Sequence, residues 1–176
     1  MKLVKFLVAT MMLISMVTLA GCGGGDKISG TYYSQILNDS SLGTYGNYVE
    51  EMTITKEGNN YYMTGRKWFY NCDIDGEKLI ANYDKSIPKQ QLKVDGNNIM
   101  INRAILGPAI LSLHDEKLEG EEFFGNQTSF EKSPEVFKKN MAALLEKYKE
   151  YYDKYGHKGS TPKVDNSKLD EALKAK

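Results

Sequence analysis

The sequence predicts a mainly β domain: an antiparallel meander of roughly eight to ten strands that forms a small barrel, followed by one long C-terminal helix. Two observations lead to this fold class. Residues 28–132 contain short runs in which apolar and polar side chains alternate between turn residues. Residues 133–156 then carry apolar side chains three and four positions apart, which is the repeat of an amphipathic helix.

The first 21 residues have the order of a secretion signal peptide. Lys2 and Lys5 supply positive charge, and the apolar run that follows ends in the small residues Ala20 and Gly21. This run is shorter than the roughly 20 apolar residues that a membrane-spanning helix needs. We therefore expect export and removal of residues 1–21, with a retained membrane helix as the alternative.

Leu19-Ala20-Gly21-Cys22 resembles the lipobox of bacterial lipoproteins. The resemblance implies cleavage before Cys22, a diacylglycerol on its sulfur and a further acyl chain, such as palmitate, on its amine. Two or more acyl chains hold a protein on a bilayer, since each buried methylene contributes about 0.8 kcal/mol. We expect a membrane-anchored protein of the bacterial cell envelope. Gly23 favours the outer membrane if the host has two membranes, and residues 22–27 form a lipidated cysteine with a glycine-rich tether.

Removal of residues 1–21 from the 176 leaves 155, the usual size of one domain. Residues 28–132 are expected to form the barrel. Its strands are predicted at residues 30–33, 48–56, 61–64, 67–74, 78–83, 91–94, 98–102, 109–114, 117–124 and 127–131. We expect a long loop at residues 38–47, a bend near Gly65 and a further loop at residues 84–88. Pro108 lacks the N–H that a ladder needs and is not expected in a central strand.

Alternation also predicts which face of residues 67–74 is buried. Trp68, Tyr70, Cys72 and Ile74 lie on one face, and we expect this face to be core. With Cys22 lipidated, Cys72 has no partner for an intramolecular disulfide. We expect it to be a small buried hydrophobe, and the alternatives are a reactive thiol or an intermolecular bridge.

Ser133-Pro134-Glu135 predicts a helix start, with Ser as N-cap and Pro in the first turn. Gly156 is the expected end. The predicted apolar stripe consists of Phe137, Met141, Leu144, Tyr148, Tyr151 and Tyr155. We expect the amphipathic helix 133–156 to pack on the barrel, with a coiled coil or partner-binding face as the alternative. Residues 157–176 are expected to be a flexible tail with at most a short helix at residues 167–176.

The sequence offers little catalytic chemistry. His114 and His157 are far apart and lack metal-ligand spacing with the single available cysteine. Acidic pairs such as Glu50-Glu51 are common on strand edges. Lys+Arg and Asp+Glu both number 23, which excludes the basic stripe of a nucleic-acid-binding protein. We expect no enzyme, no cofactor, no metal and no nucleic-acid partner.

Gly30-Thr31-Tyr32 opens the first strand and resembles the start of lipocalin-like domains, which place Gly-x-Trp there; this chain has Tyr32 instead of Trp. The resemblance implies a barrel with a cavity for a small hydrophobic ligand, or an outer surface used for protein contacts. The first hypothesis is therefore a lipid-anchored, non-catalytic lipocalin-like module that binds a small apolar ligand through Trp68, Tyr70 and Met63.

The alternative is a protein-interaction or inhibitor lipoprotein that contacts another envelope protein through the tyrosine-rich helix and residues 37–47. A third hypothesis, an enzyme, ranks lowest. It would require Glu50, Glu51, Asp73 and Arg66 to converge in a cleft.

Overall fold

The computed structural model describes residues 26–38, 46–73, 75–103, 107–121, 127–155 and 159–175. The signal peptide, Cys22, Ile74, Gly156, His157 and most of the predicted 38–47 loop lie outside these residues. The strands are β1 (Gly30–Asn38), β2 (Asn47–Glu57), β3 (Asn60–Cys72), β4 (Lys78–Asp95), β5 (Asn98–Arg103), β6 (Gly107–His114), β7 (Lys117–Glu121), β8 (Gln127–Glu131) and β9 (Lys163–Asp165). The helices are α2 (Pro134–Tyr155) and α3 (Ser167–Lys174).

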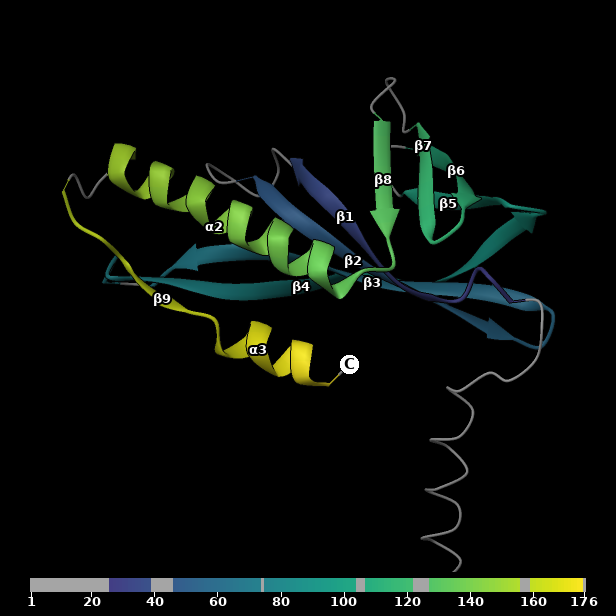
Figure 1. Cartoon of the computed structure of the whole chain (residues 1–176), viewed down its shortest axis with the longest axis horizontal. Coiled ribbons are helices and arrows are strands. Elements are labelled where there is room, and N and C mark those ends of the chain that lie inside the picture. The colour runs from purple at the N-terminus through teal and green to yellow at the C-terminus, as the bar shows by residue number, and fades with distance from the viewer. Residues whose placement is uncertain are drawn as a thin grey trace, which may run out of the picture.

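Strands β1 to β8 form a closed antiparallel barrel in which each strand pairs with its neighbours in sequence and β8 pairs with β1. This confirms the predicted mainly β meander with a long helix after it. The short strand β9 adds to β4 in parallel. Figure 1 shows β5 to β8 grouped on one side, while α2 and α3 lie along the other part of the long strands.

The two ends of the barrel differ in how the strands are joined. The end at which the chain enters β1, here termed the entry end, carries the tight turns β2–β3, β4–β5 and β6–β7. These turns use Gly58, Gly96 and Asp115, which have φ values of 60°, 59° and 55°. Gly and Asp tolerate this left-handed region better than other residues. At the opposite end, termed the far end, β1, β3, β5 and β7 finish.

Hydrogen bonds fix the start of the described chain to the entry end. The Asp26 carboxylate accepts from the backbone N–H of Ile28 at 3.2 Å and from the Tyr61 hydroxyl at 3.0 Å. The Lys132 ammonium donates to the Lys27 carbonyl at 2.7 Å. The chain therefore meets the barrel at a defined place, next to the start of β1.

Two proline-based expectations were wrong. Residues 84–88 are not a loop but part of the continuous strand β4. Met63 of β3 pairs with Gln90 of β4, and Gly65 pairs with Ile87. These pairs are two residues apart on β3 but three apart on β4, so β4 has one extra residue at Pro88. Pro108 also lies in a strand, opposite Asn102, because it sits near the start of β6, before pairing with β7 begins. Bulges and strand starts tolerate a residue that has no N–H.

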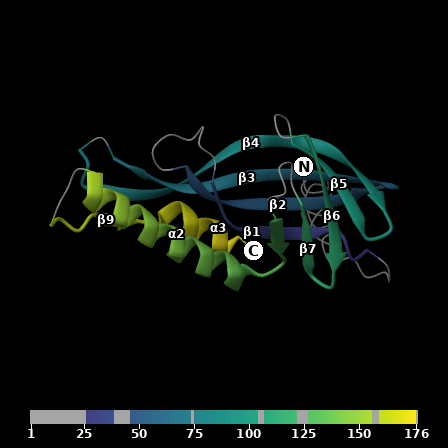
Figure 2. The same ribbon diagram turned by 90° about the horizontal axis from the view of Figure 1, so that it is seen from above.

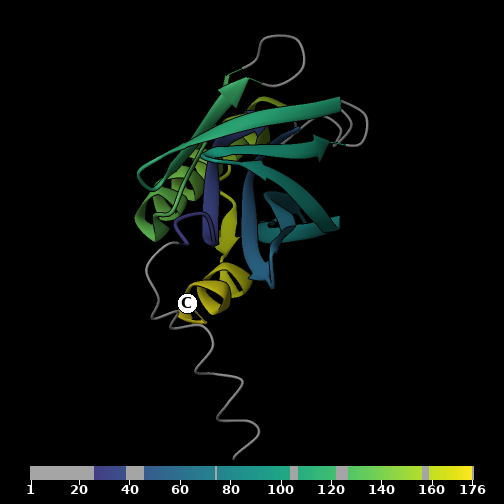
Figure 3. The same cartoon turned by 90° about the vertical axis from the view of Figure 1, so that its right-hand side faces the viewer.

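The apolar side chains form two separate cores. The barrel core lies between β1–β4 and β5–β8 and consists of Ile28, Tyr32, Met52, Ile54, Met63, Leu92, Ile99, Ile101, Leu111, Leu113, Leu118 and Phe130. The helix-side core lies on the other face of β1–β4 and consists of Tyr33, Val49, Trp68, Tyr70, Leu79, Ala81, Phe137, Met141, Leu144, Tyr148, Tyr152 and Leu169. Figures 2 and 3 show the helices on this outer face of the long strands.

Helix α2 starts as predicted and packs on the barrel. The Ser133 hydroxyl accepts from the Val136 N–H at 3.3 Å, which caps the first turn. The predicted stripe is buried from Phe137 to Tyr148, but the next buried residue is Tyr152, since Tyr151 is only half-buried. The hydroxyl of Tyr152 donates to the Gly76 carbonyl. The side chain of Tyr155 lies outside those described.

The tail is held against the barrel, contrary to the expected flexibility. Strand β9 pairs with Lys78 to Ile80 of β4, and α3 buries Leu169 in the helix-side core. The Tyr70 hydroxyl donates to Asn166 at 3.0 Å, between β9 and α3. A short strand and one apolar helix face give little signal in a polar sequence, so the contacts become visible only in the fold.

Gly120 marks a close approach between β6 and β7. A Cβ atom at this position would lie 2.1 Å from the Ile110 carbonyl oxygen. Gly120→Ala is therefore expected to lower the free energy of unfolding by about 2–3 kcal/mol, because two backbones must separate. Urea unfolding followed by the fluorescence of Trp68, the single tryptophan, measures this loss. The exposed Glu119→Ala on the same strand is the control, and equal stability of both variants would contradict the prediction.

Candidate functional site

A polar cluster lies on the helix side of β2 and β3. The Glu51 carboxylate accepts hydrogen bonds from Arg66 Nε at 3.1 Å, from Arg66 Nη2 at 3.0 Å and from Trp68 Nε1 at 2.9 Å. The Arg66 guanidinium also lies over the rings of Trp68 and Tyr83, 4.8 and 4.7 Å from their centroids. Glu51 and Arg66 are cross-strand partners, so strand register brings them together.

This cluster attaches the first turns of α2 to the sheet. Tyr33 stacks on Phe137 with centroids 4.6 Å apart, and Trp68 meets Phe137 edge-on at 5.7 Å. Burial, and then the Glu51 carboxylate, raise the pKa of Tyr33, which stays a neutral phenol. The side chains of Glu51 and Arg66 are 7% and 24% exposed. The ion pair therefore orients Trp68 under the helix.

The carboxylates considered for an enzyme lie on different surfaces. Glu51 faces α2, whereas Glu50, its buried neighbour, projects from the opposite face of β2. Asp73 lies at the far end, where its carboxylate accepts from the backbone N–H groups of Glu77 and Lys78. Within this set, Glu51 and Arg66 form an ion pair.

The residues predicted to contact a ligand do not meet. Met63 belongs to the barrel core, whereas Trp68 and Tyr70 belong to the helix-side core. Met63 and Trp68 are five residues apart on β3, and an odd spacing places two side chains on opposite faces of a strand. The predicted bend near Gly65 is absent, because β3 is continuous from Asn60 to Cys72, and alternation along it separates the three residues.

Large side chains fill the described part of the barrel interior. Tyr32, Met52, Leu111, Leu118 and Phe130 have no accessible surface. A cavity wide enough for a ligand would leave the side chains around it accessible to a water-sized sphere. Small barrels of about eight strands can be filled by their own side chains. These residues of the barrel core therefore pack against one another.

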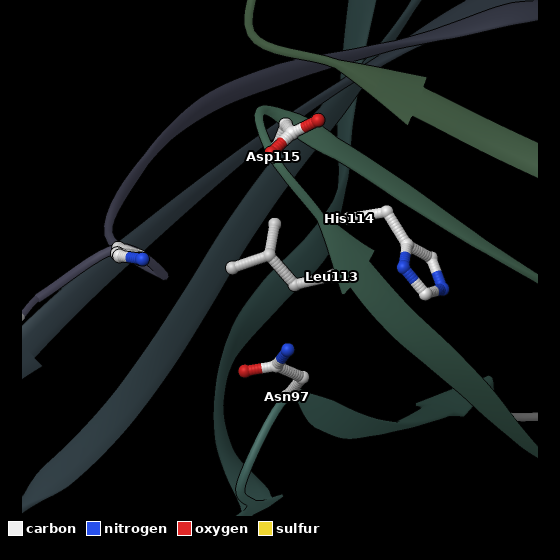
Figure 4. A pocket seen from close by; sticks show the side chains of 5 residues that line it. Asn97, Leu113, His114 and Asp115 are labelled. Atoms are coloured by element: carbon white, nitrogen blue, oxygen red, sulfur yellow. The ribbon is translucent and has the colours of Figure 1, made fainter.

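A cavity of about 260 Å³ opens at the entry end. It is lined by Lys27, Asn97, Leu113, His114 and Asp115. Figure 4 shows Leu113 between the β4–β5 and β6–β7 turns, with Asn97 on one side and Asp115 on the other. The four polar side chains are exposed, so the cavity is wet and suits a small polar molecule better than an apolar one.

Sequence reasoning missed an apolar patch on the outside of the barrel. Met100 is 37% exposed and Ile110 is 52% exposed, and the two pair across β5 and β6. Both occupy positions that alternate with buried residues, so they point outward. The sequence does contain a signal for this patch. Met100 and Ile110 are apolar at positions where alternation calls for a polar residue. Strands β5 and β6, which carry this patch, lie away from both helices (Figure 1).

The expectation that Cys72 is buried was wrong, because the thiol is exposed. Strand β3 ends at this residue, at the far end, and Cys72 is not among the buried residues of the helix-side core. Partial desolvation, and then the Asp73 carboxylate, raise the pKa of the Cys72 thiol.

Cys72 is expected to react fully with a maleimide in the folded chain, because it is exposed. The raised pKa leaves less thiolate at neutral pH, so the rate is expected to rise by about tenfold per pH unit between neutrality and pH ~9. Intact mass spectrometry of timed samples measures both. Asp73→Asn, which removes the nearby charge, is expected to react faster. A thiol that reacts only in denaturant would contradict the exposed position.

Two further findings concern the described residues. No helix among them is both long and apolar enough to cross a membrane. Among the same residues, no group of three or more His, Cys, Asp or Glu side chains could hold a metal ion.

Comparison with protein-family models, curated proteins and solved structures finds no match to this chain.

Proposed function

We propose that this chain is a lipoprotein of a bacterial cell envelope, anchored through Cys22, whose lipocalin-like barrel acts through its outer surface on another envelope protein. The packing of the two cores carries this proposal. Trp68, Tyr70 and Met63 are buried by the protein's own side chains, so the groups suited to a small apolar ligand are already in contact. We therefore place the functional contacts on the outer surface of the barrel.

The lipid anchor would also orient the domain. Only three residues separate Cys22 from Asp26, which is fixed to the entry end, so the distance from Cys22 to Asp26 is at most about 14 Å. The entry end would therefore face the membrane and the far end would point away from it. Tyr148 and Tyr152 are buried against the barrel, which leaves the strands, rather than the tyrosine stripe of α2, to meet a partner.

A second candidate function is binding of a small molecule, and the entry-end cavity favours it. Its volume of about 260 Å³ lies just below the usual range of ligand sites. Lys27 and Asp115 offer charges of both signs, so the ligand would be small and polar rather than the apolar molecule first expected.

Cellular fractionation tests the anchor. The natural chain and the control Cys72→Ser are expected in the membrane fraction, and Cys22→Ser is expected to remain uncleaved or to become soluble. Retention of Cys22→Ser in processed form on the membrane would overturn the anchor.

Affinity capture from crosslinked, solubilised membranes, followed by mass spectrometry, tests the mode of action. A reproducible protein partner supports action through the surface. Added mass of a small molecule on the captured chain, with no protein partner, would overturn it in favour of the second candidate.

A further inference from the structure

We propose that a second copy of this chain docks on the outer face of β5 and β6, forming a two-fold dimer whose copies stand side by side with both entry ends on the same side. The common orientation rests on the proposed anchor at Cys22. The contact surface itself rests on the register of four neighbouring strands.

One row of side chains crosses β4 to β7. Lys93 pairs with Met100, Met100 with Ile110, and Ile110 with Glu121. All four side chains are exposed on the outside of the barrel. The row therefore presents a positive group, two apolar groups and a negative group, in that order.

The charges at the ends of this row cannot neutralise each other within one copy. Lys93 and Glu121 are three strand spacings apart, roughly 14 Å. Neither has an ion-pair partner among the described residues. Both are thus available to a second molecule.

A two-fold axis that runs along the strands between β5 and β6 makes this row complementary to itself. It reverses the row, so that Lys93 of one copy faces Glu121 of the other and Met100 faces Ile110. Such a contact is isologous and closed, and it contains two Lys93–Glu121 pairs. An axis perpendicular to the strands would instead place Lys93 against Lys93.

The anchor selects the same axis for an independent reason. Rotation about an axis along the strands keeps the entry ends of both copies on one side, where two lipids could enter one membrane. Rotation about the perpendicular axis would send the two entry ends in opposite directions. For the row from Lys93 to Glu121, charge complementarity and membrane geometry therefore agree on one arrangement. In the next outward row the same axis sets Asp95 against Glu119, whose carboxylate already pairs with Lys117 of its own copy.

The apolar contact is small, and this predicts where the dimer forms. Met100 and Ile110 are partly exposed, and the patch falls short of the roughly 1,000 Å² that a specific interface in free solution requires. Confinement of both copies to one membrane raises their effective concentration, which lets a weak contact form. We therefore expect dimers on the membrane and monomers in dilute detergent.

Cysteine crosslinking in membranes tests this arrangement. Two differently tagged full-length copies are co-expressed, one with Met100→Cys and one with Ile110→Cys, each in a Cys72→Ser background. A disulfide between the two tags is expected. Thr64→Cys, exposed on β3 away from the patch, is the matched control and is expected to form none.

Charge reversal separates this dimer from a random encounter. Adding Lys93→Glu to both copies places like charges together at both ends of the row and is expected to lower the disulfide yield about tenfold. Adding Glu121→Lys as well restores opposite charges and is expected to restore the yield. No disulfide, a yield equal to that of Thr64→Cys, a yield unaffected by Lys93→Glu, or a disulfide to a different protein would each overturn the dimer.

Fractionation of the same samples separates the two proposals. Anchored chains without the disulfide would overturn the dimer and leave the anchor standing. A disulfide formed in a soluble fraction would overturn the anchor and leave the contact surface standing.

Discussion

Replacing Arg66 by alanine is expected to lower the free energy of unfolding by about 3–5 kcal/mol, because it leaves a buried carboxylate without its counter-ion. Glu51 accepts two hydrogen bonds from Arg66 and one from Trp68 Nε1. The cation also covers the Trp68 and Tyr83 rings, so the variant loses packing as well as charge. Urea unfolding followed by Trp68 fluorescence measures the loss.

Two variants show whether burial causes this loss. Lys89→Ala removes an ion pair whose side chains are both 51% exposed, and we expect it to cost less than about 1 kcal/mol. Arg66→Lys keeps the charge but loses the paired hydrogen bonds, so its stability is expected to lie between the other two. Similar stabilities of Arg66→Ala and Lys89→Ala would show that the buried pair contributes no more than a surface pair.

The sequence predicted the barrel because a period of two is a strong local signal. Strand β2 illustrates this, since Met52 and Ile54 are buried and Thr55 is exposed, as their alternation indicated. Turns at Gly58 and Gly96 also follow from local chemistry. Alternation does not tell which element covers each face of a strand. Both faces of β1–β4 are buried, one by strands β5–β8 and the other by the helices.

The errors at Pro88 and in the tail share one physical cause, which is that contacts distant in the sequence override local preference. Pro88 ends a strand in isolation, yet a bulge against β3 accommodates it. The tail has no apolar run of its own, yet β4 supplies an edge for β9 and a surface for Leu169. Neither partner could be read from the segment itself.

The candidate sites were predictable to different degrees. The cleavage and lipidation motif around Cys22 is a local pattern and stays a prediction, outside the described residues. The outward row from Lys93 to Glu121 depends on the register of four strands, which no short segment contains. Met100 and Ile110 could have been noticed as apolar residues on a polar face, but their alignment with two opposite charges required the fold.

Phe137→Ala is expected to cost about 3–5 kcal/mol of unfolding free energy, because it empties the centre of the helix-side core. Phe137 is fully buried and its ring contacts both Tyr33 and Trp68, so a single substitution removes one aromatic contact from α2 to β1 and one from α2 to β3. Water would reach the Trp68 ring once this cover is lost. We therefore expect a shift of the Trp68 emission to longer wavelength in the folded variant, together with a lower urea midpoint.

Lys138→Ala, one residue further along α2, separates this effect from a general weakening of the helix. Within the part of the chain that the structure describes, Lys138 pairs with the exposed Glu135, so its loss is expected to change stability by less than about 1 kcal/mol and to leave the Trp68 emission unchanged. If Phe137→Ala were as stable as Lys138→Ala and left the emission unshifted, α2 would not depend on this aromatic contact. The expected result instead makes Phe137 a main anchor of the first turns of α2 on the barrel, with the Glu51–Arg66 pair holding Trp68 in place beneath it.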